Sequence, residues 1–482
     1  MVSELVVGVD SSTQSTKVEV RTLDEGRLVG RGAADHPVVQ PPCAEQEPDA
    51  WWQAFDRALV AALGGLAAPT VVAVAVAGQQ HGMVALDRDD QPVHPAKLWN
   101  DTESSDDAVR LTAELGAEGW AAAVGSVPVS AFTITKLAWL RRTQRSAFDR
   151  IAHVLLPHDE LTRRLTGEYT TDRGDASGTG YWSAPEGRYR FDLLELVDPD
   201  VDWSGRLPLV LGPADVAGIA AHPRIAGAVV GAGTGDNMAA ALGIGVRAGE
   251  GVISIGTSGT AYAVVDSPTS DPAGEVAGFA DATGRFLPLV CTSNAGRVLD
   301  AIRRLLGVDP AELDRLALHV DESPGPTLLP YFDGERTPNR PGAHGVLAGL
   351  RSDVTREQLA RAAVDGVAFG LLDALDSLRR VGPRVERLVL TGGGSRSAAL
   401  AGTIAAGAGC PVELVDLDEA VAAGAAVQAA AAVGGVAPEE VAARWGLGVR
   451  RRVEPAGDRS VDERRAAYAE LRAATDRAPW SW

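Results

Sequence analysis

One pattern occurs once in each half of the chain: an apolar segment, a short turn of small polar residues, and a second apolar segment. The first copy runs from Leu5 to Arg21 and the second from Val252 to Val265. Short apolar segments bounded by turn residues are typical of buried strands, so each copy predicts a β-hairpin. A hairpin that recurs once per half indicates an internal duplication, and 482 residues are enough for two domains.

Strands and helices alternate between the two hairpins. Residues 71–77 read as a strand, and the segment from Asp49 to Leu63 reads as a helix whose apolar face has one large residue every four positions. This alternation predicts an α/β fold. We expect an N-terminal domain at 1–246, a C-terminal domain at 247–440, and a tail at 441–482 that packs on the fold.

Charge and cysteine content exclude several classes of function. The net charge of −19 disfavours nucleic acid and anionic membranes as partners, because both would repel the chain. The three cysteines are far apart and odd in number, so neither a full disulfide set nor a metal site is expected. A reducing cytoplasm fits this pattern. The Ala- and Gly-rich segment 420–437 reads as a helix packed closely on a sheet rather than a membrane span.

A glycine turn that ends in a carboxylate lies in the middle of the chain. Residues 231–237 read Gly-Ala-Gly-Thr-Gly-Asp-Asn, between a short apolar strand and a helix start at Met238. A helix start presents unpaired N–H groups and a positive dipole end, so Asp236 would stay ionised and accept a proton there. The alternative is that Asp236 is only an N-cap. Asp10 ends the first strand in the same way, and its alternative role is to cap a turn.

A further glycine turn, at 392–394, follows a strand at 388–391 and precedes a helix. Glycines allow a ligand to approach the backbone, and the helix start favours a phosphate or the nucleoside beside it. The turn has no Gly-Lys-Ser/Thr and is therefore not a Walker A loop. Each such turn alone can be purely structural, but together with the two hairpins they predict a nucleotide clamp.

Polar side chains suited to a sugar follow the strand at 71–77. Gln79, Gln80 and His81 come directly after this strand, at the edge where ligands bind in α/β folds. Trp99 stands beside Asn100 and Asp101 on a later loop. Amides, a neutral imidazole and an indole face match the hydroxyl groups of a sugar. The alternatives are a structural histidine at 81 and a core tryptophan at 99.

The combination of two phosphate hairpins, an adenosine glycine turn and a Gly-x-Gly-Asp-Asn loop resembles the actin-like ATPase (ribonuclease H-like) fold. Within that fold the chain resembles the FGGY family of carbohydrate kinases, almost from end to end. Residues 345–365 are similar to the C-terminal family signature, and Thr133, Lys136 and Trp139 approximate the N-terminal one. The resemblance implies a two-domain fold with a cleft between the duplicated halves.

Four segments are most similar to those family members that phosphorylate D-xylulose, namely 45–53, 77–82, 98–101 and 329–338. The resemblance implies that ATP, with Mg²⁺, phosphorylates D-xylulose to D-xylulose 5-phosphate, and a homodimer is common in the family. The chain has Gln80-His81 where this pattern often has Met-His, and Asp10-Ser11-Ser12-Thr13 where many members have Asp-x-Gly-Thr. Two alternatives remain: a kinase for another ketopentose or polyol, and an ATP-switched clamp without a sugar substrate.

The resemblance also assigns roles to residues. Asp236 would be the base that takes the sugar proton, and Asp10 the second catalytic carboxylate, which holds Mg²⁺ through water. The expected sugar-binding residues are Gln80, His81, Trp99, Asn100, Asp101 and Asn237. The expected nucleotide-binding residues are Ser12, Thr13, Lys17, Gly256, Thr257, Gly259, Gly393, Gly394 and Ser397.

Overall fold

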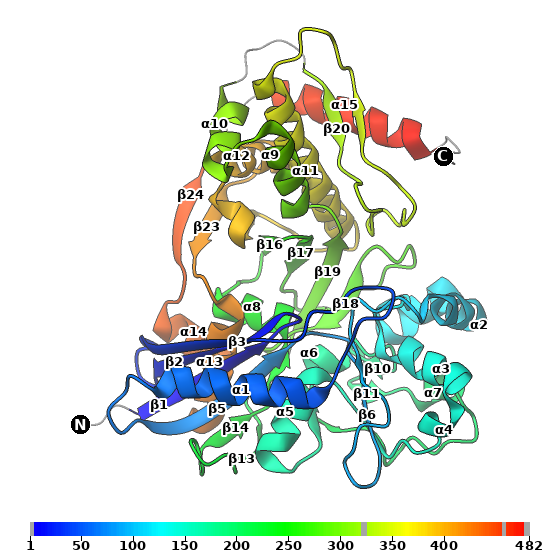
Figure 1. Cartoon of the computed structure of the whole chain (residues 1–482), viewed down its shortest axis with the longest axis vertical. Coiled ribbons are helices and arrows are strands. Elements are labelled where there is room, and N and C mark those ends of the chain that lie inside the picture. Colours follow the sequence, from blue (N-terminus) through cyan, green and yellow to red (C-terminus); the bar gives the residue numbers. More distant parts are fainter. Residues whose placement is uncertain (1–3, 320–324, 456–458, 477–482) are drawn as a thin grey trace. The chain divides into compact units, whose positions relative to one another are not determined.

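The computed structural model describes residues 4–319, 325–455 and 459–476, which pack as two compact units (Figure 1). Unit 1 combines Met1–Val246, Asp266–Leu287 and Glu419–Gly448. Unit 2 combines Arg247–Val265, Pro288–Asp418 and Val449–Trp482. The blocks expected from the sequence are contiguous, whereas each unit gathers segments from distant parts of the chain.

The sheet of unit 1 begins with three antiparallel strands and continues with parallel ones. Its order is β3 (Leu28–Asp35), β2 (Ser15–Thr22), β1 (Glu4–Ser11), β5 (Thr70–Gly78), β14 (Val229–Gly231) and β13 (Val216–Ile219). Strands β1, β5 and β14 are parallel, and β13 returns antiparallel to β14. The short β15 (Thr234–Gly235) also pairs with β5, so the turn before residue 236 lies at the end of that strand.

The sheet of unit 2 repeats this arrangement. From its second strand onward, after the edge strand β18 (Ala277–Ala280), its order is β19 (Phe286–Thr292), β17 (Gly259–Ala263), β16 (Glu250–Ile255), β22 (Arg387–Thr391), β23 (Val412–Asp416) and β24 (Val449–Val453). Again three antiparallel strands are followed by two parallel neighbours and one antiparallel strand. The matching order confirms the predicted duplication. The expected tail supplies β24, which pairs with β23 inside this sheet.

The remaining elements cover or connect the two sheets. In unit 1 they are α1 (Pro48–Leu63), β4 (Glu45–Gln46), β6 (Val84–Leu86), β7 (Ala96–Lys97), α2 (Ser105–Val124), α3 (Thr133–Thr143), α4 (Arg145–Phe148), β8 (His153–Leu155), α5 (Pro157–Thr166), β9 (Thr170–Asp172), α6 (Arg173–Ala176), β10 (Trp182–Ser183), β11 (Arg188–Tyr189), α7 (Phe191–Glu195), β12 (Leu209–Leu211), α8 (Asp236–Gly243), β18 (Ala277–Ala280), α13 (Ala420–Gly434) and α14 (Pro438–Trp445). In unit 2 they are α9 (Gly296–Leu306), α10 (Pro310–Leu318), β20 (Thr327–Leu329), β21 (Val346–Ala348), α11 (Arg356–Arg380), η1 (Gly393–Arg396), α12 (Ala398–Ala408) and α15 (Arg459–Asp476).

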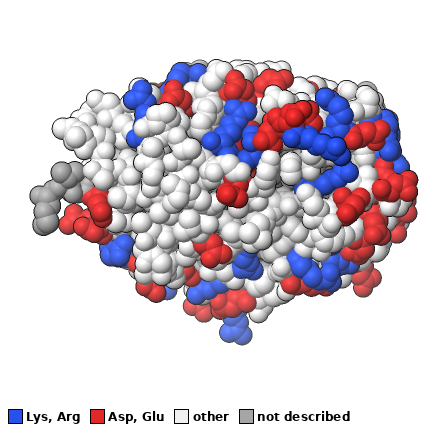
Figure 2. All heavy atoms as spheres, turned by 90° about the horizontal axis from the view of Figure 1, so that it is seen from below, with Lys and Arg blue, Asp and Glu red and all other residues white. Residues whose placement is uncertain are grey.

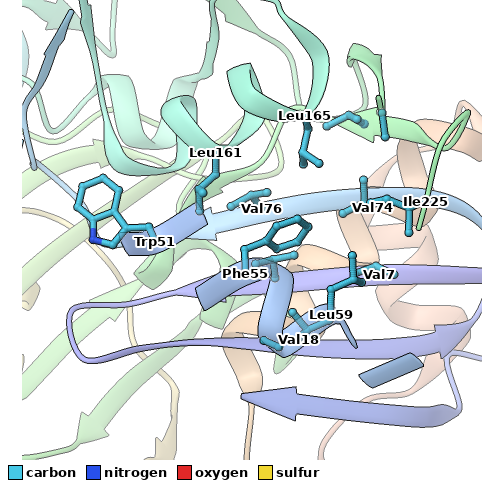
Figure 3. Packing of buried hydrophobic residues seen from close by; sticks show 14 of the residues in the cluster. Val7, Val18, Trp51, Phe55, Leu59, Val74, Val76, Leu161, Leu165 and Ile225 are labelled. Atoms are coloured by element: carbon cyan, nitrogen blue, oxygen red, sulfur yellow. The ribbon is translucent and has the colours of Figure 1, made fainter. Parts of the chain in front are cut away.

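Helix α1 forms the core of unit 1 together with one face of its sheet. Trp51, Phe55 and Leu59 are buried along one side of α1, as their four-residue spacing predicts. Figure 3 shows them in one cluster with valines of the sheet and with Leu161 and Leu165 of α5. Burying a side chain of this size contributes about 1.5–3 kcal/mol. This core holds β1 and β5 in place, and both strands end at the candidate site.

Helix α13 covers the opposite face of the same sheet at unusually short range. A Cβ atom at Gly8 of β1 would lie 1.9 Å from the Ala422 carbonyl oxygen of α13. A Cβ atom at Gly424 of α13 would lie 1.9 Å from the Ala239 carbonyl oxygen of α8. The small residues of α13 thus let its backbone touch β1 and α8 directly. The prediction of a helix packed closely on a sheet is confirmed.

A helix that crosses a membrane must be long and predominantly apolar. Among residues 4–319, 325–455 and 459–476, no single helix has the length and apolar content to cross a bilayer. One bent pair, α13 with α14, meets both requirements only when its two helices are counted together across a 118° bend. On the face seen in Figure 2, basic side chains lie interspersed with acidic ones rather than gathered in one patch.

Candidate active site

Asp10 lies near the end of β1, opposite Lys17 in the register of the first hairpin. The Asp10 carboxylate is buried and accepts a hydrogen bond from the Ser12 hydroxyl. Burial raises the pKa of Asp10 to about 6, although Ser12 and Lys17 act in the opposite direction. Lys17 Nζ lies 2.7 Å from Glu419 Oε2, so this expected nucleotide ligand forms an ion pair within unit 1.

Asp236 is the first residue of α8, and the N-cap position belongs to Gly235. The alternative that Asp236 serves only as an N-cap is therefore wrong. Its Oδ1 accepts hydrogen bonds from the Asn237 backbone N at 2.8 Å and from Asn237 Nδ2 at 2.9 Å. Burial raises the pKa of Asp236 to about 7, with further contributions from the charges of Asp10 and Asp175. A carboxyl group that titrates near neutral pH suits general-base catalysis.

Gln80 joins the loop after β5 to the start of α8. Asn237 Nδ2 donates to Gln80 Oε1 at 3.0 Å, and a Cβ atom at Gly235 would lie 2.6 Å from Gln80 Cγ. Among the described residues, the buried amide nitrogens Nε2 of Gln79 and Gln80 have no hydrogen-bond partner. Leaving a buried donor unpaired costs about 1–3 kcal/mol. Of these two amides, that of Gln80 is joined to Asp236 through Asn237 and is suited to donate to a ligand there.

His81 has a left-handed backbone, with φ of 67°. Its Nδ1 lies 2.8 Å from the Gly178 carbonyl oxygen, and its ring packs between Phe132 at 5.0 Å and Phe279 at 5.4 Å, measured between ring centroids. A bond to a carbonyl oxygen assigns the proton to Nδ1 and makes Nε2 an acceptor. His81 is thus held rigidly on one side, as the structural alternative expects, while its ring remains suited to a sugar hydroxyl.

Lys136 anchors the loop that leads to Phe132. Its side chain is buried and donates to the carbonyl oxygens of Ser130, at 3.0 Å, and Ala131. Burial lowers the pKa of Lys136 to about 7. Lys136, a residue of the N-terminal signature, therefore supports Phe132, the aromatic neighbour of His81.

Trp99 contacts the first hairpin through its indole nitrogen. Trp99 Nε1 donates to Thr13 Oγ1 at 2.8 Å, and Thr13 Oγ1 donates to Gln79 Oε1 at 3.3 Å. The hydroxyl of Thr13 therefore links the tryptophan to the loop after β5. The amide oxygen Oδ1 of Asn100 is buried and has no partner among the described residues.

Asp101 belongs to an interior ion cluster around Lys97. Its Oδ2 accepts from Lys97 Nζ at 3.0 Å and from the Ala44 backbone N at 2.9 Å. Lys97 Nζ also lies 2.7 Å from Glu45 and 2.6 Å from Glu103. Asp101 is fully buried, so in this structure it supports its own loop rather than presenting its carboxylate to solvent.

In unit 2 the second hairpin presents an exposed turn between β16 and β17. Gly256 and Thr257 are exposed, whereas Gly259 is buried. A Cβ atom at Gly259 would lie 2.5 Å from Leu371 Cδ2, so this glycine is packed against side chains of unit 2. Helix α9 starts at this turn, because the Gly296 backbone N donates to the Gly256 carbonyl at 2.9 Å.

The turn after β22 is only partly open. A Cβ atom at Gly394 would lie 2.3 Å from Ile255 Cγ2, while the space beside Gly393 is empty within 4 Å. Ser397 is the N-cap of α12, and its hydroxyl donates to Asp314 of α10. Asp314 also accepts from the Ala399 backbone N at 3.0 Å. A carboxylate of the chain thus already occupies the start of α12, which the sequence did not predict.

A buried ionic cluster packs against the loop after β5 and the turn before α8, and sequence reasoning missed it. His158 Nδ1 lies 2.6 Å from Asp175 Oδ2, and His158 Nε2 lies 3.2 Å from Asp159 Oδ1. Asp172 accepts from Thr234 Oγ1 at 2.7 Å. Burial opposes the charge of His158, but the neighbouring carboxylates outweigh it and raise its pKa to about 9. One sequence signal was available, because Asp172 caps the short helix that carries Asp175.

Comparison with known proteins identifies the family. Residues 5–243 match the N-terminal domain of the FGGY family of carbohydrate kinases, and residues 251–433 match its C-terminal domain. The chain belongs to the FGGY family of carbohydrate kinases. Its mixed α/β fold is the actin-like ATPase fold of these enzymes, and membership of a kinase family implies ATP as the phosphoryl donor.

Three similar proteins show how closely the chain follows individual members. It is 48% identical to a xylulose kinase of Streptomyces coelicolor over 92% of this chain and 90% of that one. A solved xylulose kinase structure from Bifidobacterium adolescentis is 40% identical, with a TM-score of 0.85, and the match covers 98% and 100% of the two chains. A gluconate kinase structure from Lactobacillus acidophilus has a TM-score of 0.90 at 20% identity, and the match covers 99% of both chains. At this identity it shows the shared fold alone.

Proposed function

We propose that the protein transfers the γ-phosphoryl group of ATP to D-xylulose and so forms D-xylulose 5-phosphate. The observation that carries this proposal is the Asp236 carboxylate, joined through Asn237 to Gln80, whose buried amide nitrogen lacks a partner in the described chain. A base and hydroxyl-binding amides are what a sugar kinase needs at one place. The identity to xylulose kinases supports D-xylulose over other sugars.

Asp236 would act as the general base of the transfer. Phosphoryl transfer depends mainly on in-line positioning and charge neutralisation, and the base takes the proton of the attacking hydroxyl. Because Asn237 already binds Oδ1 of Asp236, we assign the proton to Oδ2. Gln80 and Asn237 are joined by a hydrogen bond, so together they would orient the sugar against this oxygen.

Asp10 fits a role in holding Mg²⁺ through water. Its carboxylate is buried and its charge raises the pKa of Asp236, so two acidic groups repel each other here. A divalent cation relieves such repulsion, and Mg²⁺ usually keeps several waters and binds few carboxylates. Bound there, Mg²⁺ would neutralise charge on the transferring phosphates. The nearby Lys17 is already paired with Glu419, which leaves this task to the metal.

Each unit has backbone that is open to a nucleotide. In unit 1, Ser12 and Thr13 form the tip of the first hairpin. In unit 2, the exposed turn at Gly256 and Thr257 and the open space beside Gly393 allow a ligand close to the chain. Glycines at such positions suit phosphates because no side chain stands in the way. We infer that Gly259, Gly394 and Ser397 act indirectly, by shaping these turns.

A substrate panel tests the proposal. Purified protein is assayed for ADP release with ketopentoses, polyols and sugar acids, and D-xylulose is expected to give the highest kcat/KM. If glycerol or gluconate gave the highest value, the sugar assignment would be wrong while the kinase assignment stood. The same slow ADP release with and without every sugar would instead indicate a nucleotide-switched clamp.

We also infer that the protein works in the cytoplasm as a homodimer. Its three cysteines are free thiols, which suits a reducing compartment that supplies ATP. Sedimentation velocity tests the oligomeric state, and a single species of monomer mass would refute the dimer.

A further inference from the structure

The buried cluster around His158 touches both loops that carry the proposed sugar and proton contacts. A Cβ atom at Gly78 would lie 3.0 Å from His158 Cβ, and one at Gly233 would lie 2.9 Å from His158 Cδ2. Gly78 directly precedes Gln79, Gln80 and His81. Gly233 directly precedes the segment that ends in Asp236 and Asn237. His158 therefore packs against the base of each loop, with its backbone and Cβ at Gly78 and with its imidazole at Gly233.

Polar contacts tie the same two loops to the cluster. Burial raises the pKa of Asp175, and a hydrogen bond from the His81 backbone opposes this rise. His81 Nδ1 contacts the carbonyl of Gly178 just beyond α6. On the other loop, Thr234 Oγ1 donates to Asp172, the N-cap of α6. Helix α6 thus receives one polar contact from each loop, and His158 holds α6 through Asp175 at 2.6 Å.

We propose that the buried His158–Asp175 ion pair is a positioning pair, which fixes Gln80 and His81 relative to Asp236. Neither residue is assigned a contact with the sugar. They act through the two loops, so their removal should loosen both loops together. The proposal rests on the proposed function only for the identity of the sugar.

The energetics of burial favour this role over simple stabilisation. Removing two charges from water costs several kcal/mol per ion, and apolar replacements of buried ion pairs are often as stable as the originals. Here one imidazole faces three carboxylates, those of Asp159, Asp172 and Asp175, and all four side chains are buried. A directional pair holds its two partners at a set distance and angle, which apolar packing does less strictly. That property matches what the two loops require.

Hydrogen exchange on the ligand-free full-length protein tests the proposal without any substrate. In Asp175→Asn the amides of 78–83 and 233–237 should exchange at least about tenfold faster, since a hydrogen bond to a charged group contributes about 1.5–3 kcal/mol. The matched control is Glu19→Gln, which breaks another buried ion pair of unit 1, at 2.6 Å from Arg21 on β2. That control should lower Tm without changing exchange in the two segments.

A second pair of variants covers the histidine. Asn at 158 retains an N–H donor close to the Nδ1 position but carries no charge, whereas Leu retains neither. We expect His158→Leu to loosen both segments as Asp175→Asn does, and His158→Asn to give intermediate exchange. Wild-type exchange in both segments of the folded Leu variant would overturn the proposal, as would loosening of only one segment.

Steady-state kinetics then separates this proposal from the function. In Asp175→Asn, KM for D-xylulose should rise about tenfold while KM for ATP stays within about twofold, by the same hydrogen-bond energy. A partly unfolded sample would lose apparent kcat but keep both KM values. If the wild-type protein did not phosphorylate D-xylulose, the function would be refuted, and the exchange data would still decide the positioning role. An unchanged KM for D-xylulose in an active variant would refute the positioning role and leave the proposed function standing.

Discussion

Replacing Asp236 with Asn should nearly abolish turnover without weakening the fold. The Asn side chain has the same shape, and its Oδ1 can still accept from the backbone N of Asn237, now 2.8 Å from Asp236 Oδ1. It cannot accept the sugar proton. General-base catalysis contributes about 10²–10⁴-fold, so kcat should fall by that factor while ATP binding persists.

The structure also gives the sign of the stability change. Burial raises the pKa of Asp236 from 3.8 to about 7, so between these pH values the folded protein binds more protons than the unfolded chain. Its stability therefore falls as pH rises through this window. The full difference corresponds to about 4 kcal/mol at 1.36 kcal/mol per pH unit, an upper limit because Asp236 is only half-buried. Asn does not titrate, so the free energy of unfolding of Asp236→Asn should increase relative to that of the wild type as pH rises.

Urea unfolding at pH 5 and pH 8, together with the coupled ADP assay, measures both effects. The variant should be at least as stable as the wild type at pH 5 and clearly more stable at pH 8. Turnover within a few-fold of the wild type, with no pH-dependent gain in stability, would remove Asp236 from the mechanism.

Three further predictions concern the pH profile, the tryptophan contact and the core. The wild-type kcat should fall about tenfold per pH unit below pH 7, because the base must be ionised; a rate that held constant down to pH 5 would contradict the raised pKa of Asp236. Trp99→Phe removes the 2.8 Å bond to Thr13, worth about 1 kcal/mol, and should raise KM for D-xylulose about fivefold while Tm falls by only a few degrees. Phe55→Ala should lower the free energy of unfolding by about 3–5 kcal/mol in urea titrations, and a loss below 1 kcal/mol would show that the core of unit 1 repacks freely.

Local patterns predicted much of the fold because they depend on neighbouring residues. The two hairpins, the buried face of α1 and the strand at β5 all follow from apolar spacing, which acts over a few positions. The assignment of segments to units did not follow in this way. Residues 266–287 and 419–448 pack with unit 1 because of contacts to chain far away in the sequence. Such contacts leave no periodic pattern in either segment.

The candidate site was predicted by residue type but not by interaction. Asp10, Gln80, His81, Asp236 and Asn237 were expected, and all of them lie in unit 1. That Asn237 binds both Gln80 and Asp236 depends on tertiary packing, and so does the role of Asp101 as a ligand of Lys97.

The most consequential feature that the sequence patterns did not predict is the cluster around His158. Its four members are spread over α5, β9 and α6, and none of them belongs to a motif. Only the folded chain shows that they meet.

The direct contact of α13 with β1 and α8 affects how sequence variation in this family should be interpreted. At Gly8, Gly243 and Gly424 even one methyl group would collide with backbone atoms at about 2 Å, so almost no replacement is sterically admissible. In a deep mutational scan these three positions should appear as intolerant as Asp236, although none bears a reactive group. Invariance at these glycines would reflect the short distance between the backbone of α13 and those of β1 and α8. Asp10 and Asp236 depend on this packing because β1 carries Asp10 and α8 carries Asp236.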